Sequence, residues 1–182
     1  MAKLISKTYG EALFELAIEE QKLDELLEEA GTVREILSEN PDFGKLMTHP
    51  KISKDEKTAV MENVFKGRVS NEMAGFLMIM VEKGRYIELD TALTYFIDKV
   101  KEVKHIGVAK VTTAVVLDEA VQTKIKERLL ETTRYQEMEI QYLVDPSIIG
   151  GMVIRIGDRV IDSSITTKLS ELKKQLLKIQ LG

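Results

Sequence analysis

Apolar residues recur every three or four positions through the first 104 residues of the chain, and the positions between them are mostly polar or charged. One apolar stripe runs along residues 4–17 and a second along residues 23–37. This period is that of an α-helix that buries one face, so the pattern predicts two amphipathic helices. Asn40-Pro41 ends the second, because the residue before a proline avoids the α region, and a short helix is predicted over residues 41–47.

Local signals mark the ends of the next helices. Ser53 and Glu56 have the spacing of a capping box, which predicts a helix from this point to about Gly67. A further helix is predicted over residues 71–83, because Gly84 suits the position just after a helix. The last apolar stripe of this region runs over residues 86–103. Five or six helices joined by short loops predict an antiparallel helical bundle over residues 1–105.

The period of the pattern changes after Lys104. Residues 108–117 are rich in valine and threonine and residues 138–144 alternate, so both predict strands, with a helix capped by Asp118 between them. Two shorter strands, 152–156 and 159–161, flank Gly157-Asp158, a glycine-first turn that suits a hairpin. The predicted order is β-α-β-β-β-α, a small α/β domain over residues 106–182. The fold class of the whole chain is therefore predicted to be α+β.

The last predicted helix follows the hairpin directly. Ser163 and Ser164 offer hydroxyls to the open backbone N–H groups at its start. Nothing in this block indicates catalysis, and it is interpreted as a surface that holds a partner. The apolar residues of the helix are four, three, four and three positions apart, which places them in one stripe: Ile165, Leu169, Leu172, Leu176 and Ile179.

The composition of the chain excludes several classes of protein and of functional site. The 182 residues are 44% hydrophobic and 31% charged, which is enough for one large or two small domains. The chain has no cysteine, and this excludes disulfides, zinc–cysteine sites and thiol nucleophiles. The N-terminus does not have the pattern of a signal peptide. The longest apolar run, residues 75–81, is far shorter than the roughly 20 residues that span a bilayer, so we expect no direct membrane insertion.

No residue pattern predicts a catalytic, cofactor-binding or metal site. His49 and His105 are the only histidines, and neither has the neighbours of a metal ligand or of a catalytic base, so both are interpreted as surface residues. Gly150-Gly151 opens a strand rather than a helix, and close backbone approach explains this pair better than phosphate binding. Helix capping likewise explains the serine pair after the hairpin better than a nucleophile does.

Two features of the surface leave alternatives open. Asp158 and Asp162, near Arg155 and Arg159, would form either a docking surface or ordinary surface ion pairs. The apolar face of the first helix and residues 75–81 would either line a groove for an amphipathic helix or fill the core. In helical bundles such residues are more often buried in the core than exposed to a partner.

Three segments of the chain resemble the delta subunit family of F-type ATP synthases, called the oligomycin-sensitivity-conferring subunit in mitochondria. The most specific reads Gly-Gly-x-x-Ile-Arg-x-Gly-Asp-x-Val-Ile-Asp-x-Ser over residues 150–164, before an amphipathic helix. Residues 9–17 are similar to the family's first helix, and residues 82–86 to its Glu-Asn-Gly-Arg-Leu helix junction. Their order and spacing extend the resemblance over essentially the whole chain. Lys83 stands where the family usually has asparagine, and Gly10 where it usually has alanine.

The resemblance implies a non-catalytic stator subunit of the peripheral stalk. Such a subunit links the catalytic alpha/beta head to the b subunits, so that proton-driven rotation is coupled to ATP synthesis. A six-helix domain, residues 1–105, would bind the head, and residues 106–182 would bind the stalk. The resemblance also implies one copy per complex, no cofactor, and a place on the cytoplasmic face of the bacterial cell membrane, reached through the complex.

Two other classes of function compete with this expectation. One is a nucleic-acid-binding module built on the C-terminal β-α-β-β unit, which the net charge of −4 disfavours. The other is an uncharacterised enzyme, which the lack of cysteine and the scarcity of histidine disfavour.

The resemblance also implies two sets of binding residues. In the family, the N-terminal helix of an alpha subunit lies between the first and fifth helices, and the matching positions here are Tyr9, Ala12, Leu13, Leu16, Gly75, Phe76, Ile79 and Met80. The C-terminal ends of the b subunits bind the C-terminal region, and the matching positions here are Gly150, Gly151, Arg155, Gly157, Asp158, Ile161, Asp162, Leu169, Leu172 and Leu176.

Overall fold

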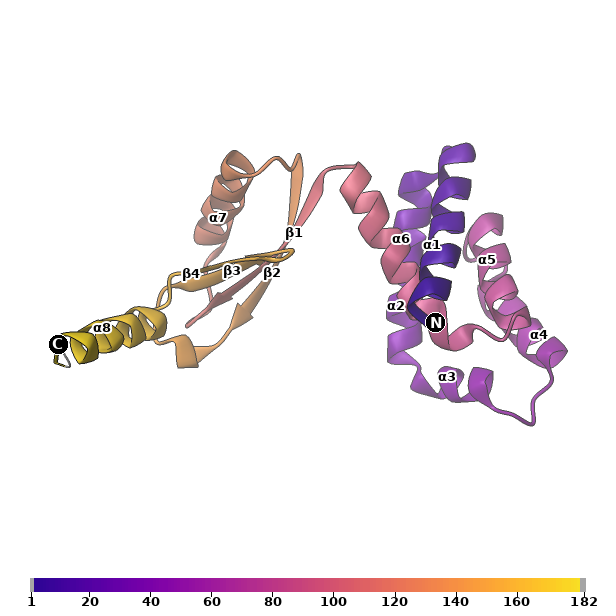
Figure 1. Cartoon of the computed structure of the whole chain (residues 1–182). Helices are drawn as coiled ribbons and strands as arrows, with labels where there is room; N and C mark the ends of the chain where they lie inside the picture. The colour runs from indigo at the N-terminus through magenta and orange to yellow at the C-terminus, as the bar shows by residue number, and fades with distance from the viewer. Residues whose placement is uncertain (1, 181–182) are drawn as a thin grey trace. The chain divides into compact units, whose positions relative to one another are not determined.

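The computed structural model describes residues 2–180, with side chains over residues 4–177. Over these residues the chain forms eight α-helices and one four-stranded sheet (Figure 1), which confirms the predicted mixed α+β class. The chain divides into two compact units, Met1–Lys101 and Glu102–Gly182. The change of hydrophobic period predicted a boundary at residue 105, and the division of the structure falls between Lys101 and Glu102.

The first unit is helical, and its helices end where the local signals predicted. Ser53 Oγ accepts a hydrogen bond from the Glu56 backbone N–H, and the Glu56 carboxylate accepts one from the Ser53 N–H. Gly84 follows the fifth helix, and the Arg85 N–H donates back to the Met80 carbonyl, which closes the helix end. The elements are α1 (Ala2–Glu19), α2 (Leu23–Glu39), α3 (Pro41–Thr48), α4 (Lys54–Phe65), α5 (Asn71–Glu82), a 3₁₀ turn (Tyr86–Glu88) and α6 (Leu89–Val103).

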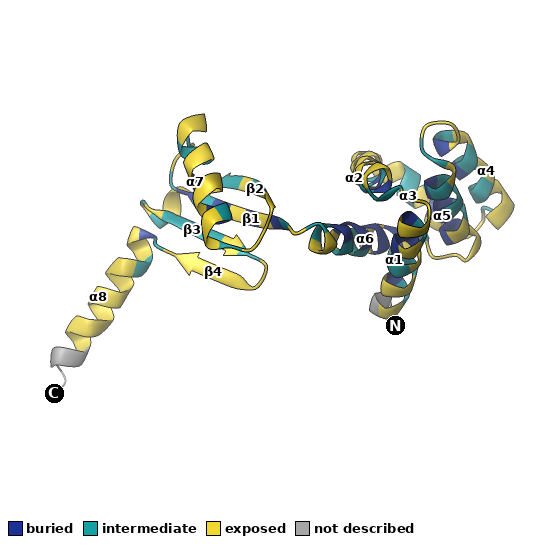
Figure 2. Ribbon diagram, turned by 90° about the horizontal axis from the view of Figure 1, so that it is seen from above, coloured by how far each residue is buried: buried dark blue, intermediate teal, exposed yellow. Residues whose placement is uncertain are grey.

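The apolar faces of these helices form a single core. Figure 2 shows the buried residues on the inner faces of the helices and the exposed residues on the outer ones. The side chains of Leu26, Val33, Met61, Leu77 and Phe96 are completely buried. Burial of this apolar area, at roughly 25 cal/mol per Å², is the main term that stabilises the unit.

Polar contacts join α5 to the beginning of the unit. The Glu29 carboxylate on α2 accepts hydrogen bonds from Ser70 N (2.6 Å) and Ser70 Oγ (2.7 Å), while Ser70 Oγ accepts one from Met73 N. A carboxylate at this place also offsets the positive end of the α5 dipole. Lys22, just after α1, pairs with Glu72 in the first turn of α5 at 2.7 Å. These contacts hold the start of α5 against α2 and the loop before it.

The second unit contains the sheet. Its strands lie in the order β2-β1-β3-β4, with β1 parallel to β2 and antiparallel to β3, and β3 antiparallel to β4. The parallel pair requires a crossover, which α7 provides. The elements are β1 (Ile106–Thr113), α7 (Glu119–Thr132), β2 (Glu137–Val144), a 3₁₀ turn (Pro146–Ile148), β3 (Met152–Ile156), β4 (Arg159–Asp162) and α8 (Ile165–Gln180).

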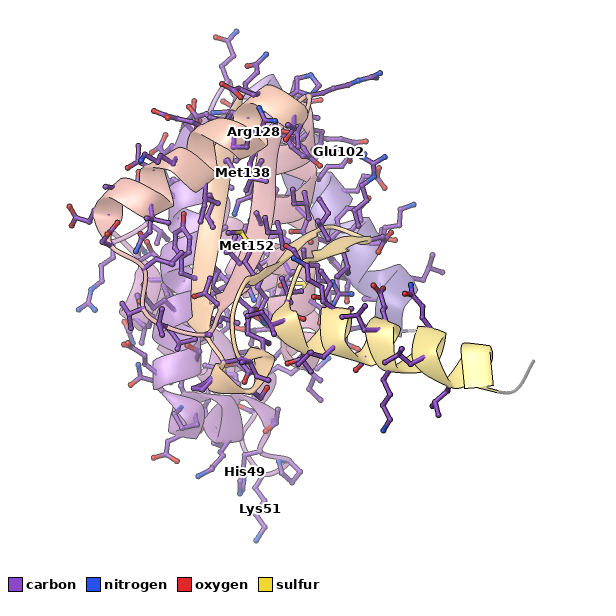
Figure 3. The ribbon with its side chains drawn as sticks, turned by 90° about the vertical axis from the view of Figure 1, so that its left-hand side faces the viewer. His49, Lys51, Glu102, Arg128, Met138 and Met152 are labelled. Atoms are coloured by element: carbon purple, nitrogen blue, oxygen red, sulfur yellow. The ribbon has the colours of Figure 1, made fainter. Side chains whose placement is uncertain are left out.

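A small core lies between α7 and one face of the sheet. Ala109 and Val111 of β1 are fully buried there, against Ile125 and Leu129 of α7. Met138, labelled in Figure 3, is buried in the same cluster. The predicted N-cap of α7 is confirmed, since Asp118 accepts a hydrogen bond from Val121 N at 2.7 Å.

The first predicted strand is shorter than expected. β1 ends at Thr113, whereas the valines and threonines predicted a strand up to residue 117. β1 and β2 end together, with Thr113 opposite Val144, and the hydroxyl of Thr113 donates to the Val115 carbonyl. Val115 and Val116 therefore have no strand partner and lie exposed. β-branched residues favour a strand only where a neighbouring strand completes the ladder.

Gly10 allows α1 and α6 to approach closely. A Cβ atom at this buried position would lie 2.7 Å from Cδ1 of Tyr95 and 2.8 Å from the carbonyl oxygen of Ala92. We expect Gly10→Ala to lower the free energy of unfolding by about 1–3 kcal/mol, because overpacking against a backbone oxygen exceeds the gain in helix propensity. Urea denaturation followed by circular dichroism measures the change.

Gly31 provides the matched control for this substitution. It lies on the exposed side of α2. Apart from its chain neighbours and the backbone of its own helix, no atom lies within 4 Å of the position that a Cβ atom would take. Gly31→Ala should therefore raise stability by up to about 1 kcal/mol through helix propensity alone. Equal stabilisation by both alanines would contradict the close approach at Gly10.

Candidate partner-binding surfaces

The junction between β4 and α8 is held by side-chain hydrogen bonds. The carboxylate of Asp162 accepts one from the Ser164 N–H (2.8 Å) and one from the Thr167 hydroxyl (2.7 Å). Ser164 is 2% exposed, and its Oγ accepts a bond from the Thr167 N–H, which confirms the predicted cap. The first turn of α8 is therefore fixed to the end of the hairpin by two residues at once.

The Gly150-Gly151 pair makes room for this junction. Gly151 has φ +77°, and a Cβ atom there would overlap the carbonyl oxygen of Ser163. The Ser163 N–H and hydroxyl both donate to the Met152 carbonyl, and the Ile165 N–H donates to the Gly150 carbonyl at 2.9 Å. The prediction of close backbone approach is confirmed. Ser163 is thus bound to the strand, and it is Ser164 that caps the helix.

A third contact holds α8 from the side of the 3₁₀ turn. The hydroxyl of Thr166 donates to the Ser147 carbonyl at 3.0 Å. The turn itself is closed by Asp145, whose carboxylate accepts the Ser147 N–H at 2.9 Å. The segment over residues 150–164 therefore has a structural role, because it sets the direction in which α8 leaves the sheet.

α8 leaves its apolar stripe uncovered. The exposed fractions of its four described members rise from 42% at Ile165 to 65% at Leu176. In its own unit the helix packs mainly against the 3₁₀ turn at its start, and Figure 1 shows the rest projecting away from the sheet. Ile179 belongs to the same stripe, but its side chain lies outside the described residues. Exposed large apolar residues in one line indicate an interaction surface.

A hollow of about 590 Å³ lies on the α7 face of the sheet, beside the β3–β4 hairpin. Its floor includes Ile154, Ile156 and Ile161, and its rim includes Arg134 and Arg159. Sequence reasoning did not predict the hollow, because Arg134 and the hairpin are brought together only by the sheet order. Ile161 was predicted as a binding residue and is 57% exposed.

The charged residues of the hairpin do not pair with one another. Among the side chains that the structure describes, no ion pair joins Arg155 or Arg159 to Asp158 or Asp162. Arg155, Arg159 and Asp158 are exposed, and the Asp162 carboxylate is used by the helix cap. Gly157, with φ +55°, forms the hairpin turn with Asp158.

The residues expected to line a groove between α1 and α5 divide into two groups. Leu13, Phe76 and Met80 are buried in the core of the unit, at 8% exposure or less. Ala12 and Ile79 are exposed, and Ile79 reaches 47%. Tyr9, Leu16 and Gly75 are half-buried.

The two histidines lie on the surface. His49 and His105 are both exposed, as expected, and Figure 3 shows His49 beside Lys51 at a loop tip. No three histidine, aspartate or glutamate side chains within the described residues are placed to hold a metal ion. None of the helices, over the residues searched, is long and apolar enough to cross a membrane.

Comparisons with known proteins find relatives that match over nearly the whole chain. The family model for the ATP synthase delta (OSCP) subunit matches residues 5–176. ATP synthase subunit delta of Lachnoclostridium phytofermentans is 55% identical over 182 residues, the whole of both chains. The same subunit of Alkaliphilus oremlandii is 37% identical over 179 residues, which cover 98% of this chain and 99% of that one.

The fold also matches a solved structure. A chain in the cryo-EM structure of the Toxoplasma gondii mitochondrial ATP synthase hexamer has a similar fold, with a TM-score of 0.73 and 20% identity. The match covers 94% of this chain and 97% of that chain.

Gly151→Ala should disrupt the junction. The left-handed backbone alone costs an alanine about 1–2 kcal/mol, and the overlap with Ser163 adds to it, so we expect a loss of about 3 kcal/mol. Gly157→Ala is the control, because it shares the positive φ but has open space around a Cβ. Thermal unfolding of the two variants should show the larger loss for Gly151→Ala, and equal losses would contradict the close contact.

The cap at Asp162 should be lost in acid. The Ser164 N–H, the strongest contributor, and the hydroxyls of Ser164 and Thr167 lower the pKa of Asp162 from its ordinary value. A carboxyl with a lowered folded pKa stabilises the fold above its ordinary pKa, and this contribution disappears as the pH falls through the folded pKa. The protection factors of the Ser164 and Thr167 amides, which allow for the slower intrinsic exchange in acid, should therefore fall below about pH 4. The Asn side chain of Asp162→Asn does not titrate, so this fall should be absent there, and an unchanged acid profile in that variant would refute the assignment.

Proposed function

Because this chain belongs to the ATP synthase delta (OSCP) subunit family, we propose that it is the stator joint between the catalytic head and the peripheral stalk. As a member of this family it is a structural subunit of the ATP synthase and not a catalytic one. The observation that supports the proposal best is the uncovered apolar stripe of α8, whose first turn is held by the hydrogen bonds of the junction.

A stator joint works through affinity. Rotation of the central shaft exerts torque on the head, and the head must not turn with it, or proton flow does no work. The joint needs two binding surfaces that hold different partners at once. Burial of apolar area supplies the affinity, at roughly 25 cal/mol per Å², less the cost of ordering the partners. The division of the chain into two compact units fits this requirement.

We assign the head-binding surface to the first unit, between α1 and α5. The proposed occupant is the N-terminal helix of an alpha subunit, which would lie on Ala12 and Ile79 with Tyr9, Leu16 and Gly75 beside them. Small residues next to a large exposed one suit the close approach of an amphipathic helix. Leu13, Phe76 and Met80 would support this surface from the core without reaching the partner.

We assign the stalk-binding surface to the second unit. The C-terminal ends of the b subunits would contact Ile161 of the hairpin and the stripe of α8. Arg155 and Asp158 would lie on the polar rim of the contact. Gly150, Gly151, Gly157 and Asp162 would act by shaping the hairpin and aiming the helix. The protein would then lie peripherally, on the cytoplasmic face of a bacterial membrane, in one copy per complex.

A nucleic-acid-binding role has no support. The chain carries a net charge of −4, and membership of the family accounts for the C-terminal domain without it.

Titration of the full chain with a synthetic peptide of the alpha subunit's N-terminal helix, from the same organism, tests the head-binding surface. We expect saturable one-to-one binding by calorimetry. Ile79→Glu should weaken it at least about tenfold, because a charge would be buried in an apolar contact.

Ile18→Glu is the matched control, since Ile18 is 48% exposed and lies on the opposite side of α1 from Leu16. Circular dichroism of both variants should remain helical. Equal weakening by the two variants, or no binding to the folded wild type, would remove the α1–α5 assignment and leave the second unit as the docking surface.

A further inference from the structure

We propose that α8 is one strand of a heteromeric coiled coil, whose other strand is an amphipathic helix with acidic residues along both edges of its apolar seam. The inference rests on the proposed function only for the identity of that helix, which would belong to a b subunit. The chemistry of the partner follows from the residues of α8 itself.

Five of the six apolar residues of α8 have the spacing of a heptad seam, and the sixth, Leu177, lies at a b position outside it. Steps of four, three, four and three residues place Leu169 and Leu176 at a positions and Ile165, Leu172 and Ile179 at d positions. A stripe limited to a and d is narrower than the stripe of a helix that packs on a globular core. It has a period of 3.5 residues, and this period fits one facing helix over several turns.

The edges of the seam are basic. The residues at the e and g positions of the described part are Thr166, Lys168, Lys173 and Gln175, with no carboxylate among them. The helix carries four lysines and only Glu171, at a c position, against them. Residues at e and g form interhelical ion pairs and determine partner choice. A partner helix with glutamate or aspartate at its own edges is complementary to these lysines.

The same charges disfavour a second copy of the chain as the partner. In a parallel pair, the g residue of one helix faces the following e residue of the other, which would place Lys168 opposite Lys173. In an antiparallel pair, g faces g and e faces e, so each lysine edge would meet a copy of itself. Like charges in these positions select against self-association.

A membrane surface fits α8 less well. Helices that lie in the membrane interface carry a wide apolar face, often with tryptophan or phenylalanine, and basic residues over the polar face. α8 has no aromatic residue, and its stripe is a narrow seam. A lipid surface would also attract Lys174, at the f position opposite the seam, as strongly as Lys173.

The structure explains how α8 is formed and exposed before a partner binds. Isolated helices as short as the 16 residues of α8 are marginal in water. The contacts of Asp162, Ser164 and Thr166 fix its first turn, and the seam beyond remains exposed. A facing helix would bury the seam that the free chain leaves exposed.

The test uses the full chain and two designed peptides. Both have three heptads with Ile at a and Leu at d, and they differ only in glutamate or lysine at every e and g position. Calorimetry at low salt should show one-to-one binding of the acidic peptide, with none of the basic one. Lys168→Glu and Lys173→Glu should each weaken the acidic peptide by about fivefold, since each replaces an attractive pair by a repulsive one.

Lys174→Glu is the matched control, because it makes the same charge change one residue along, on the far side of the helix. It should leave the affinity unchanged within about twofold. Leu172→Glu, at an exposed seam position, should abolish binding while circular dichroism shows the rest of the chain folded. Equal effects of Lys173→Glu and Lys174→Glu, on the peptide or on phosphatidylglycerol vesicles, would overturn the coiled coil in favour of non-specific charge attraction.

Two further outcomes separate this inference from the proposed function. The first is measured by analytical sedimentation. If the wild type sediments as a dimer and Leu172→Glu as a monomer, the seam is covered by a second copy of the chain, and the inference is overturned. The C-terminal region of the b subunit from the same organism is then titrated. If it binds independently of Lys173 and Leu172, the stator function survives and the coiled coil fails. If only the acidic peptide binds, with the expected dependence on the lysine edges, the coiled coil stands and the assignment of the b subunit fails.

Discussion

The contact between Gly151 and Ser163 determines what the second unit offers to other molecules. The backbone of the β4–α8 junction lies so close to the start of β3 that no side chain fits between them. Because the two segments touch, the hydrogen bonds from Ser163 to Met152 and from Ile165 to Gly150 can form. They fix the position from which α8 departs, and the Asp162 carboxylate then fixes its first turn. The direction of the exposed seam thus depends on Gly151, which lies outside the seam itself.

Much of the fold was predictable from the sequence because the signals were local. The capping box at Ser53, the glycine after α5 and the Asp118 cap each act within one helical turn, and each forms as predicted. The predicted strand that extended beyond Thr113 failed because strand formation depends on a neighbour. β2 ends at Val144, and no ladder remains for Val115 and Val116.

The candidate sites were less predictable, because burial depends on how helices pack. The apolar residues of α1 and α5 have one periodicity, yet Leu13 and Met80 are core residues while Ala12 and Ile79 are exposed. Only the packing of both helices on a common core separates these groups. The hollow beside the hairpin could not be foreseen either, since Arg134 and Ile161 are distant in sequence and meet only through the strand order. The stripe of α8 was predictable because its neighbours are consecutive turns of one helix.

The two units differ in whether they bury or expose their large apolar side chains, and this difference is relevant to the function of a stator joint. Unit 1 buries its large apolar residues in a core and leaves few of them exposed, whereas α8 exposes every described member of its seam. An exposed seam would ordinarily promote self-association. The lysines along its edges oppose that association, and the same lysines attract an acidic partner. A single arrangement of charge therefore keeps the free subunit apart from its copies and selects its partner.

Ile149, a β-branched residue beside the glycine pair, has φ +66°, a value that such residues rarely adopt. Local preferences are most often overridden where function requires a particular geometry, and here the geometry concerned is the departure of α8 from the sheet.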